Sequence, residues 1–365
     1  MKRLAIALFF CLLLTGCWDQ VQLKKLLFVD VVGLDYVKDT KRLQTSYVIS
    51  SLREASQGGG KASGLFLQST GENLYDAVNQ SNKEFPGVLN TLETRLYLIS
   101  TQFAKDQPLD YLNTTSQFTS NPLYAYLAVY DGDLTKLLAK KKIKGLTVSD
   151  FLVGILDEEK KRGKIPTNKL LRLILGGAEF MNDFALNRFE PYKDGARLAG
   201  TALFRDGKYT GINLNDEETQ MAFLLDGVNG KYQLLTGSGG ENAHTVLVQN
   251  SKRKFHLHTN PNGLQEIDVA LKMDLKLIEN GTGKSNISNQ ELKKLEKTME
   301  AELTSKSSEV IGILKRANCD YLQLGHEVAA FHPNLYRKMN WREEYPKLKI
   351  KPIVNVRILN TGIVE

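Results

Sequence analysis

The sequence predicts a mixed α/β (α+β) protein of three domains, each with a mixed or antiparallel sheet and packed helices. Apolar and polar residues alternate strictly from 267 to 277, which indicates a long strand with one buried face. Ser288 and Glu291 have the spacing of a capping box, and an apolar stripe after them predicts a long helix through Leu314. The length of 365 residues exceeds that of one ordinary core and favours several domains.

The first seventeen residues have the pattern of a bacterial lipoprotein signal. Lys2 and Arg3 give a positive start, residues 4–14 are almost all apolar, and Leu-Thr-Gly stands directly before Cys17. A charged start, a short apolar run and small residues at the cut describe a secretory signal. We therefore predict a mature chain that begins at Cys17 and carries a lipid on its thiol, with acyl groups such as palmitate. A transmembrane helix, the alternative, needs about 20 apolar residues, almost twice this run.

Changes in composition divide the remaining chain. We predict a signal peptide at 1–16, a lipidated tether at 17–25, an N-terminal α/β domain at 26–133, a helix-rich middle domain at 134–195 and a C-terminal α/β domain at 196–365. The division at 133/134 lies where a lysine-rich run begins, and the division at 195/196 lies near a polar stretch around Pro191.

The N-terminal domain is predicted to combine strands with short helices. Apolar runs bounded by turn residues predict strands at 26–37, 43–50, 65–69, 96–100 and 123–130. Apolar residues at helical spacing predict a helix within 72–85, and a proline opens a short helix at 108–112.

The middle domain begins with a concentration of lysines. Residues 134–146 contain five of them: Lys136, Lys140, Lys141, Lys142 and Lys144. We interpret this run as the solvated face of a helix, with contact to acidic lipid headgroups as the alternative. A helix at 149–161 and an apolar segment at 170–175 follow.

The C-terminal domain has the clearest local patterns. Asp-Gly at 206–207 predicts a hairpin between strands at 199–205 and 208–212. A short helix at 216–225 and strands at 244–248 and 254–258 precede the long strand and the long helix. A closing strand at 348–358 contains Pro352, which places it at a sheet edge or a bulge.

Charge and cysteine content exclude two classes of protein. The formal charge is +7, and loss of Lys2 and Arg3 with the signal leaves +5, which suits an anionic membrane surface but is too dilute for nucleic acid binding. Cys11 leaves with the signal and Cys17 carries lipid, so Cys319 has no partner for an intramolecular disulfide. The mature chain is therefore not a disulfide scaffold.

Two motifs that look chemical lack a required residue. Residues 281–285, Gly-Thr-Gly-Lys-Ser, resemble the end of a phosphate loop, but Ile278 stands where a glycine is required. His326 with Glu327 begins like a zinc-protease helix, but Ala330 replaces the second histidine and His332 is out of phase.

Three further features also fall short of a site. His256 and His258 would share a strand face but have no evident third ligand. Ser238 lies in a glycine-rich loop without the nucleophile-elbow pattern. Cys319 is interpreted as a buried structural thiol. We therefore predict no catalytic residue, no metal site and no cofactor.

An ordered set of motifs resembles the Ger(x)C family, the C subunits of spore germinant receptors. Gly16-Cys17-Trp18-Asp19 resembles the lipobox and first mature residues of that family. Gly33-Leu34-Asp35 resembles its first-strand motif, and residues 200–211 resemble the hairpin that opens its C-terminal domain. Cys319-Asp320, Gly325, His332-Pro333, Trp341 and Tyr345-Pro346 resemble its closing block.

The resemblance implies both a fold and a function. It implies three mixed α/β domains, a lipid anchor on the outer face of the spore inner membrane, and work beside an A subunit and a polytopic B subunit. Members of the family are required for the response to nutrient germinants and have no known catalytic activity. For contacts with partners, the sequence offers the lysine run at 136–144 and the exposed face of the helix at 292–314.

Two other functions stay open at this point. A solute-binding lipoprotein of an uptake system predicts two doubly wound lobes, and the strict alternation at 267–277 favours one-sided strands instead. A surface hydrolase requires a nucleophile, base or metal set, which the motifs do not supply.

Overall fold

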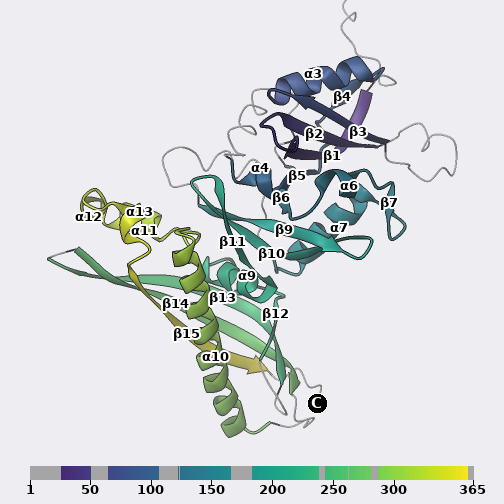
Figure 1. The fold of residues 1–365 in the computed structure, drawn as a ribbon. Coiled ribbons are helices and arrows are strands. Elements are labelled where there is room, and N and C mark those ends of the chain that lie inside the picture. The colour runs from purple at the N-terminus through teal and green to yellow at the C-terminus, as the bar shows by residue number, and fades with distance from the viewer. Residues whose placement is uncertain are drawn as a thin grey trace, which may run out of the picture.

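The computed structural model describes residues 26–50, 65–106, 122, 124–165, 183–237, 243–261, 263–280 and 287–360. Figure 1 shows two main sheets, a larger one built from the first half of the chain and a smaller one flanked by a long helix. The larger sheet has nine strands and the smaller has four, and each contains both parallel and antiparallel pairs. The predicted mixed α+β class is confirmed.

The nine-stranded sheet has the order β11-β10-β9-β6-β5-β1-β2-β3, with β4 beside β1. Its strands are β1 (Leu26–Tyr36), β2 (Leu43–Ser50), β3 (Leu65–Gly71), β4 (Val88–Asn90), β5 (Leu96–Ser100), β6 (Tyr126–Tyr130), β9 (Phe184–Tyr192), β10 (Gly195–Arg205) and β11 (Lys208–Leu214).

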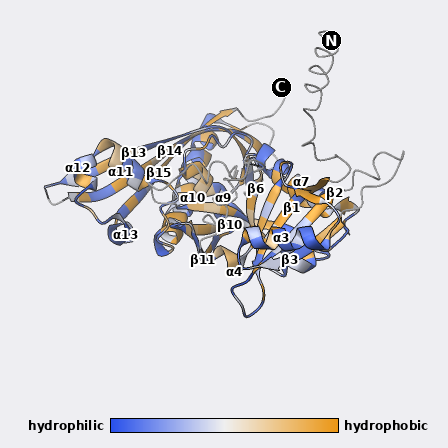
Figure 2. Cartoon of the chain, turned by 90° about the horizontal axis from the view of Figure 1, so that it is seen from above, coloured by the Kyte–Doolittle hydropathy of each residue, from blue (hydrophilic) through white to orange (hydrophobic). Residues whose placement is uncertain are grey.

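Helices cover both faces of this sheet, which explains why its central strands are almost wholly apolar. Helices α3 (Leu74–Glu84) and α4 (Thr101–Ala104) pack on the face that carries Val32 and Leu34. Helices α6 (Leu134–Leu138) and α7 (Val148–Lys161) pack on the opposite face, with Val31. Figure 2 shows the hydrophobic colour on strands around β1 and a largely hydrophilic α3.

The β10–β11 hairpin forms as its turn residues predict. Asp206 and Gly207 both have positive φ, at 49° and 76°, as a two-residue hairpin turn requires. Gly200 also has a positive φ of 77° and lies where the pairing of β10 with β9 shifts register. A Cβ at Gly200 would lie 2.0 Å from the carbonyl oxygen of Leu214, so the backbones meet too closely there for any other residue.

The four-stranded sheet has the order β12-β13-β14-β15. Its strands are β12 (Leu234–Thr236), β13 (His244–Asn260), β14 (Gly263–Asn280) and β15 (Lys349–Asn360). The alternating apolar residues of β14 are buried toward helices α9 (Asp216–Leu225) and α10 (Asn289–Arg316), as predicted. The capping box of Ser288 and Glu291 at the start of α10 is confirmed.

The two sheets share one hydrophobic core through α9. Ala185, Leu203 and Leu214 of the larger sheet belong to the same buried cluster as β14 and α10. Helices α11 (Leu324–Phe331), α12 (Pro333–Tyr336) and α13 (Trp341–Glu344) follow α10 and precede β15. The C-terminal helices therefore lie beside the end of the larger sheet (Figure 1).

The two short strands predicted at 244–248 and 254–258 are one strand, β13. A register shift between Val248 and Asn250 changes the phase of the alternation. Beyond it, Ser251 and Arg253 face the same side as buried residues of β14. These polar side chains remove the apolar signal from the middle of the strand, so the prediction of two strands is wrong.

Pro352 lies on an edge strand, as predicted, because β15 pairs only with β14. The free side of β15 is closed by α10. The Glu296 carboxylate accepts a hydrogen bond from the Ile358 amide at 2.8 Å, and the Glu300 carboxylate accepts one from the Val356 amide at 2.9 Å. The helix thereby satisfies edge amides that another strand would otherwise pair.

The prediction that the lysine run at 134–146 forms one face of a helix is wrong. Helix α6 ends at Leu138, and the chain then forms a tight hairpin of β7 (Lys142–Ile143) and β8 (Leu146–Thr147). Lys144 and Gly145 both have positive φ, which a helix does not allow. The predicted segments at 108–112 and 170–175 lie outside the described residues.

The predicted divisions between three domains stay predictions. Strands from 26–133 share one sheet with β9, β10 and β11, and the β9–β10 hairpin spans the division at 195/196. Pro191 fits in β9 because β6 pairs with that strand only up to Phe189. Two buried clusters cover the two faces of the larger sheet, and a third belongs mainly to the chain after 196.

Candidate functional site

Cys17, the predicted site of lipid attachment, lies outside the described residues, as do residues 281–285. Within the described ranges, no helix combines the length and the apolar character needed to cross a membrane.

The lysine run forms an exposed basic surface in several pieces. All five lysines are exposed, but only Lys136 lies on a helix, where it pairs with Asp133 at 3.2 Å. Lys140 donates to the carbonyl oxygen of Asp194 at 2.7 Å, and Lys144 lies 5.9 Å from the ring centroid of Phe151. The run is therefore accessible to a partner but does not present one continuous helical stripe.

The outer face of α10 carries mainly polar side chains. Its exposed residues include Lys293, Lys294, Lys297, Thr298, Ala301, Ser305 and Ser308. The opposite face buries Met299, Leu303 and Leu314 against the sheet. The exposed face offers polar contacts to a partner but no apolar patch.

An ion pair with a buried carboxylate joins the C-terminal helices to the larger sheet, and the sequence patterns did not indicate it. The Arg342 guanidinium donates two hydrogen bonds to the Asp183 carboxylate, each 2.6 Å long, and also bonds the Asp206 carboxylate. The Asp183 side chain is only 1% exposed. Asp183 precedes β9 and Asp206 lies in the β10–β11 turn, so Arg342 of α13 ties both to the C-terminal helices.

Asp320 forms a second buried polar centre next to this pair. Its carboxylate accepts hydrogen bonds from the amides of Leu324 and Gly325, at 2.9 and 2.7 Å, and from Nε1 of Trp341 at 3.0 Å. Burial raises the pKa of Asp320 to about 7, against the lowering effect of these donors. Its own amide donates to Asp183 at 2.6 Å, so the two centres are connected.

The raised pKa of Asp320 predicts a loss of stability as pH rises. The folded pKa of about 7 lies above the unfolded value near 4, so the folded state binds the extra proton between these pH values. This contribution to stability is full below about pH 4 and is lost as pH rises through 7. Between pH 5 and pH 7, we expect the free energy of unfolding, measured by urea denaturation, to fall by about 2 kcal/mol more in the wild type than in Asp320→Asn. Equal losses in the two proteins would contradict the assignment.

The histidines and Cys319 do not assemble into a chemical centre. His256 and His258 share a face of β13 as predicted, and His258 bonds Asp268 at 2.8 Å. His326 is exposed on α11, and His332 follows the end of that helix. Cys319 is buried, which raises the pKa of its thiol well above its usual value. Among the described residues, no three His, Cys, Asp or Glu side chains are placed to hold a metal ion.

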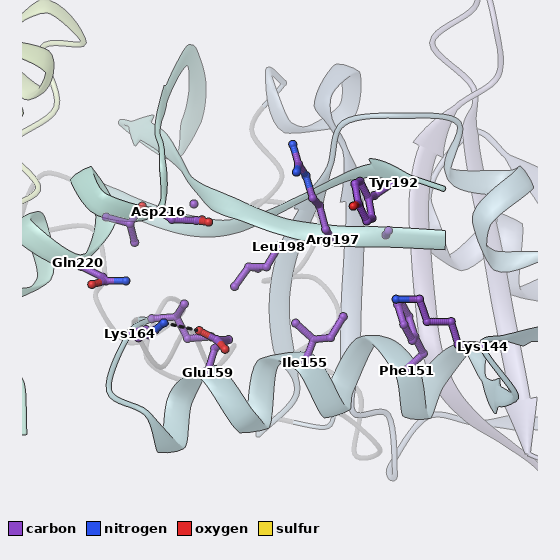
Figure 3. A pocket seen from close by; sticks show the side chains of 14 residues that line it. Lys144, Phe151, Ile155, Glu159, Lys164, Tyr192, Arg197, Leu198, Asp216 and Gln220 are labelled. Atoms are coloured by element: carbon purple, nitrogen blue, oxygen red, sulfur yellow. Dashed lines mark ion pairs between the residues drawn. The ribbon is translucent and has the colours of Figure 1, made fainter. Parts of the chain in front are cut away.

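A cavity of about 480 Å³ lies between α7, the β9–β10 hairpin and the start of α9. Figure 3 shows Phe151, Ile155 and Glu159 of α7 facing the strand that carries Leu198. Glu159 lies 3.9 Å from Lys164. Arg197 pairs with Glu190 at 2.6 Å and stacks over the ring of Tyr192. The charges of the wall are thus largely paired with one another.

Comparisons with known proteins assign this fold to a family. The family model described as spore germination B3/GerAC-like, C-terminal, matches residues 199–362, and the model described as the spore germination protein N-terminal domain matches residues 19–189. Spore germination protein GerQC of Bacillus cereus is 21% identical over 368 residues and is covered completely, as is this chain. Spore germination protein B3 of Bacillus subtilis is also 21% identical, over all of this chain and 98% of its own length.

A solved structure has the same fold. The crystal structure of the GerBC protein matches with a TM-score of 0.58 and 16% identity, over 90% of this chain and 97% of that one. The two family models together span both sheets described above. This chain belongs to the GerAC-like family of spore germination proteins.

Proposed function

We propose that this protein is a non-enzymatic lipoprotein subunit of a nutrient germinant receptor complex. The observation that carries the proposal is the match of both family models, which extends from residue 19 to residue 362 with one short interruption. The relatives that match over the full chain are named spore germination proteins. The motif that ends at Cys17 supports attachment of lipid to that residue.

In this proposal the anchor and the folded body have different tasks. One acyl chain holds a protein only marginally, whereas two or more hold it firmly at about 0.8 kcal/mol per buried methylene. Attachment through Cys17 keeps the sheets at the outer face of the spore inner membrane and raises their effective concentration for A-type and B-type receptor subunits. The work of the protein is then docking, through surfaces such as the lysine run and the outer face of α10.

A solute-binding lipoprotein, the alternative, predicts two doubly wound lobes. The described sheets are instead one large mixed sheet and one four-stranded sheet with helices on a single face. No feature of the described residues favours the alternative over the receptor subunit.

Co-purification from spore inner membranes tests the proposed partners. We expect A-type and B-type receptor subunits to be recovered with the acylated protein in comparable amounts, as measured by mass spectrometry. Recovery with an uptake permease, or without either subunit, would contradict the proposal.

A further inference from the structure

The two outer edges of the four-stranded sheet differ in how far other elements cover them. On β15, Glu296 and Glu300 of α10 accept hydrogen bonds from edge amides. On β13, β12 covers only residues 245–247, and Tyr232 and Gln233 extend the pairing to Val248. Further along, the loop after α9 contacts the side chain of Ser251, and the last residue of α9, Leu225, accepts a hydrogen bond from Arg253. One edge is therefore closed by a helix, and the other is covered along only part of its length.

Residues 254–258 of β13 form the uncovered part of that edge. They pair with β14 on one side, and among the described residues no strand pairs with their other side. In an antiparallel pair, alternate residues direct their amide and carbonyl groups away from the partner strand. This stretch therefore presents backbone donors and acceptors at the spacing that an added strand requires.

The side chains beside this edge on the helix-free face are basic. Lys252 lies directly opposite Lys272, and Lys254 lies opposite Ala270. No carboxylate of the described residues lies within ion-pair distance of Lys252, Lys254 or Lys272. The acidic residues on this face of β14 are instead paired with other side chains: Glu266 with Lys349, Asp268 with His258, and Asp274 with Arg357. Like charges directly opposite each other destabilise a sheet, so an acidic partner here would relieve repulsion.

Residues 254–258 place two apolar side chains, Phe255 and Leu257, on the other face of the edge. Phe255 and Leu257 line a cavity of about 600 Å³ between β13 and α11. Phe331 at the end of α11 forms another wall of that cavity and is 72% exposed. Arg253, Glu327 and His332 line the same cavity. An added strand would thus meet lysines on one face and, on the other, a recess in which Phe255, Leu257 and Phe331 lie beside charged and polar side chains.

We propose that residues 254–258 of β13 bind an extended segment of a partner protein whose acidic and apolar side chains alternate. The segment adds a strand at this edge, with its acidic residues beside Lys252 and Lys254 and its apolar residues toward Phe255, Leu257 and Phe331. A second copy of this chain is a poor occupant, because it would place another basic edge, with its own Lys252 and Lys254, against this one. The inference depends on neither the lipid anchor nor the receptor partners proposed above.

Binding of a defined peptide to the purified full-length protein tests this proposal. The probe is a fluorescein-labelled peptide with the sequence Glu-Val-Glu-Phe-Glu-Val. The control peptide has the same composition, with all acidic residues in one block. We expect fluorescence polarisation to show at least tenfold tighter binding of the alternating peptide, because only that order separates the two kinds of side chain onto opposite strand faces. Hydrogen exchange should slow at residues 254–258 when this peptide binds.

Two variants with matched controls locate the site. Lys252→Glu/Lys254→Glu should weaken binding at least tenfold, whereas Lys293→Glu/Lys294→Glu, the same charge change on the outer face of α10, should change it less than twofold. Phe331→Asp should weaken binding at least fivefold, whereas Tyr124→Asp, at a side chain that is 76% exposed elsewhere, should not.

Four results would overturn the proposal. Equal affinity for the two peptides, or equal loss in the α10 control, would reduce the interaction to general attraction between charges. Flotation with phosphatidylglycerol vesicles that depends on Lys252 and Lys254, without peptide binding, would assign the basic face to lipid headgroups. Dimers that form through residues 254–258 would make a second copy the occupant.

Discussion

Replacement of Arg342 by alanine is expected to lower the free energy of unfolding by about 3–5 kcal/mol. The side chain holds Asp183 through two hydrogen bonds of 2.6 Å, and that carboxylate is 1% exposed. Its removal leaves the buried carboxylate with the amides of Asp206 and Asp320 as donors but without its cation. Because Arg342 also bonds Asp206, the substitution loosens the attachment of α13 to the larger sheet as well.

Denaturation by urea measures this loss of stability. Two further variants separate the effect of the buried pair from that of removing any arginine. Arg357→Ala removes an arginine of the same kind from an ion pair with Asp274, but that side chain is 60% exposed, so we expect a loss below about 1 kcal/mol. Asp183→Asn/Arg342→Met removes both charges and should recover a large part of the stability. A loss in Arg342→Ala no greater than in Arg357→Ala would show that the pair does not stabilise the attachment of α13 to the larger sheet.

Cys17→Ala is expected to release the protein from the membrane fraction and to abolish the response of spores to nutrient germinants. Without the thiol there is no attachment point for acyl chains, and the hydrophobic free energy that retains the protein at the bilayer is lost. Immunoblots of fractionated spores measure the first effect, and the fall in optical density after addition of nutrient measures the second.

Cys11→Ala is the matched control, because it changes a cysteine of the same signal that is predicted to be absent from the mature chain. It should leave both membrane retention and the nutrient response unchanged. A normal response from a soluble, unacylated Cys17→Ala protein would rule out the docking mechanism.

Local sequence patterns predicted the elements whose formation depends on near neighbours. The strict alternation at 267–277, the capping box at Ser288 and the Asp-Gly turn at 206–207 all form as expected. In each, the determining interaction lies within a few residues or repeats with the period of the element. Pro352 likewise indicated an edge strand or a bulge, because a missing amide is tolerated at such positions, and β15 is an edge strand.

The features that the patterns missed depend on residues far apart in the chain. Asp183 and Arg342 were ordinary charged residues until the fold placed them together, and no spacing rule connects them. The middle of β13 was missed because Arg253 is polar yet lies on the buried face, where it donates to carbonyl oxygens of Leu225 and Leu322. In the lysine run, composition indicated exposure correctly but could not show that the backbone turns at Lys144 and Gly145.

The separation of Asp183 and Arg342 by 159 positions also sets an order of assembly. During synthesis the strands of the larger sheet leave the ribosome long before α13. The Asp183 carboxylate, just before β9, therefore has no Arg342 to pair with until almost the whole chain has been made. Contacts of such long sequence separation form late, because a large loop must close first. The attachment of the C-terminal helices to Asp183 is therefore expected to form late, after the strands of the larger sheet, which all precede residue 215, have been made. A chain truncated before residue 342 would lack this attachment.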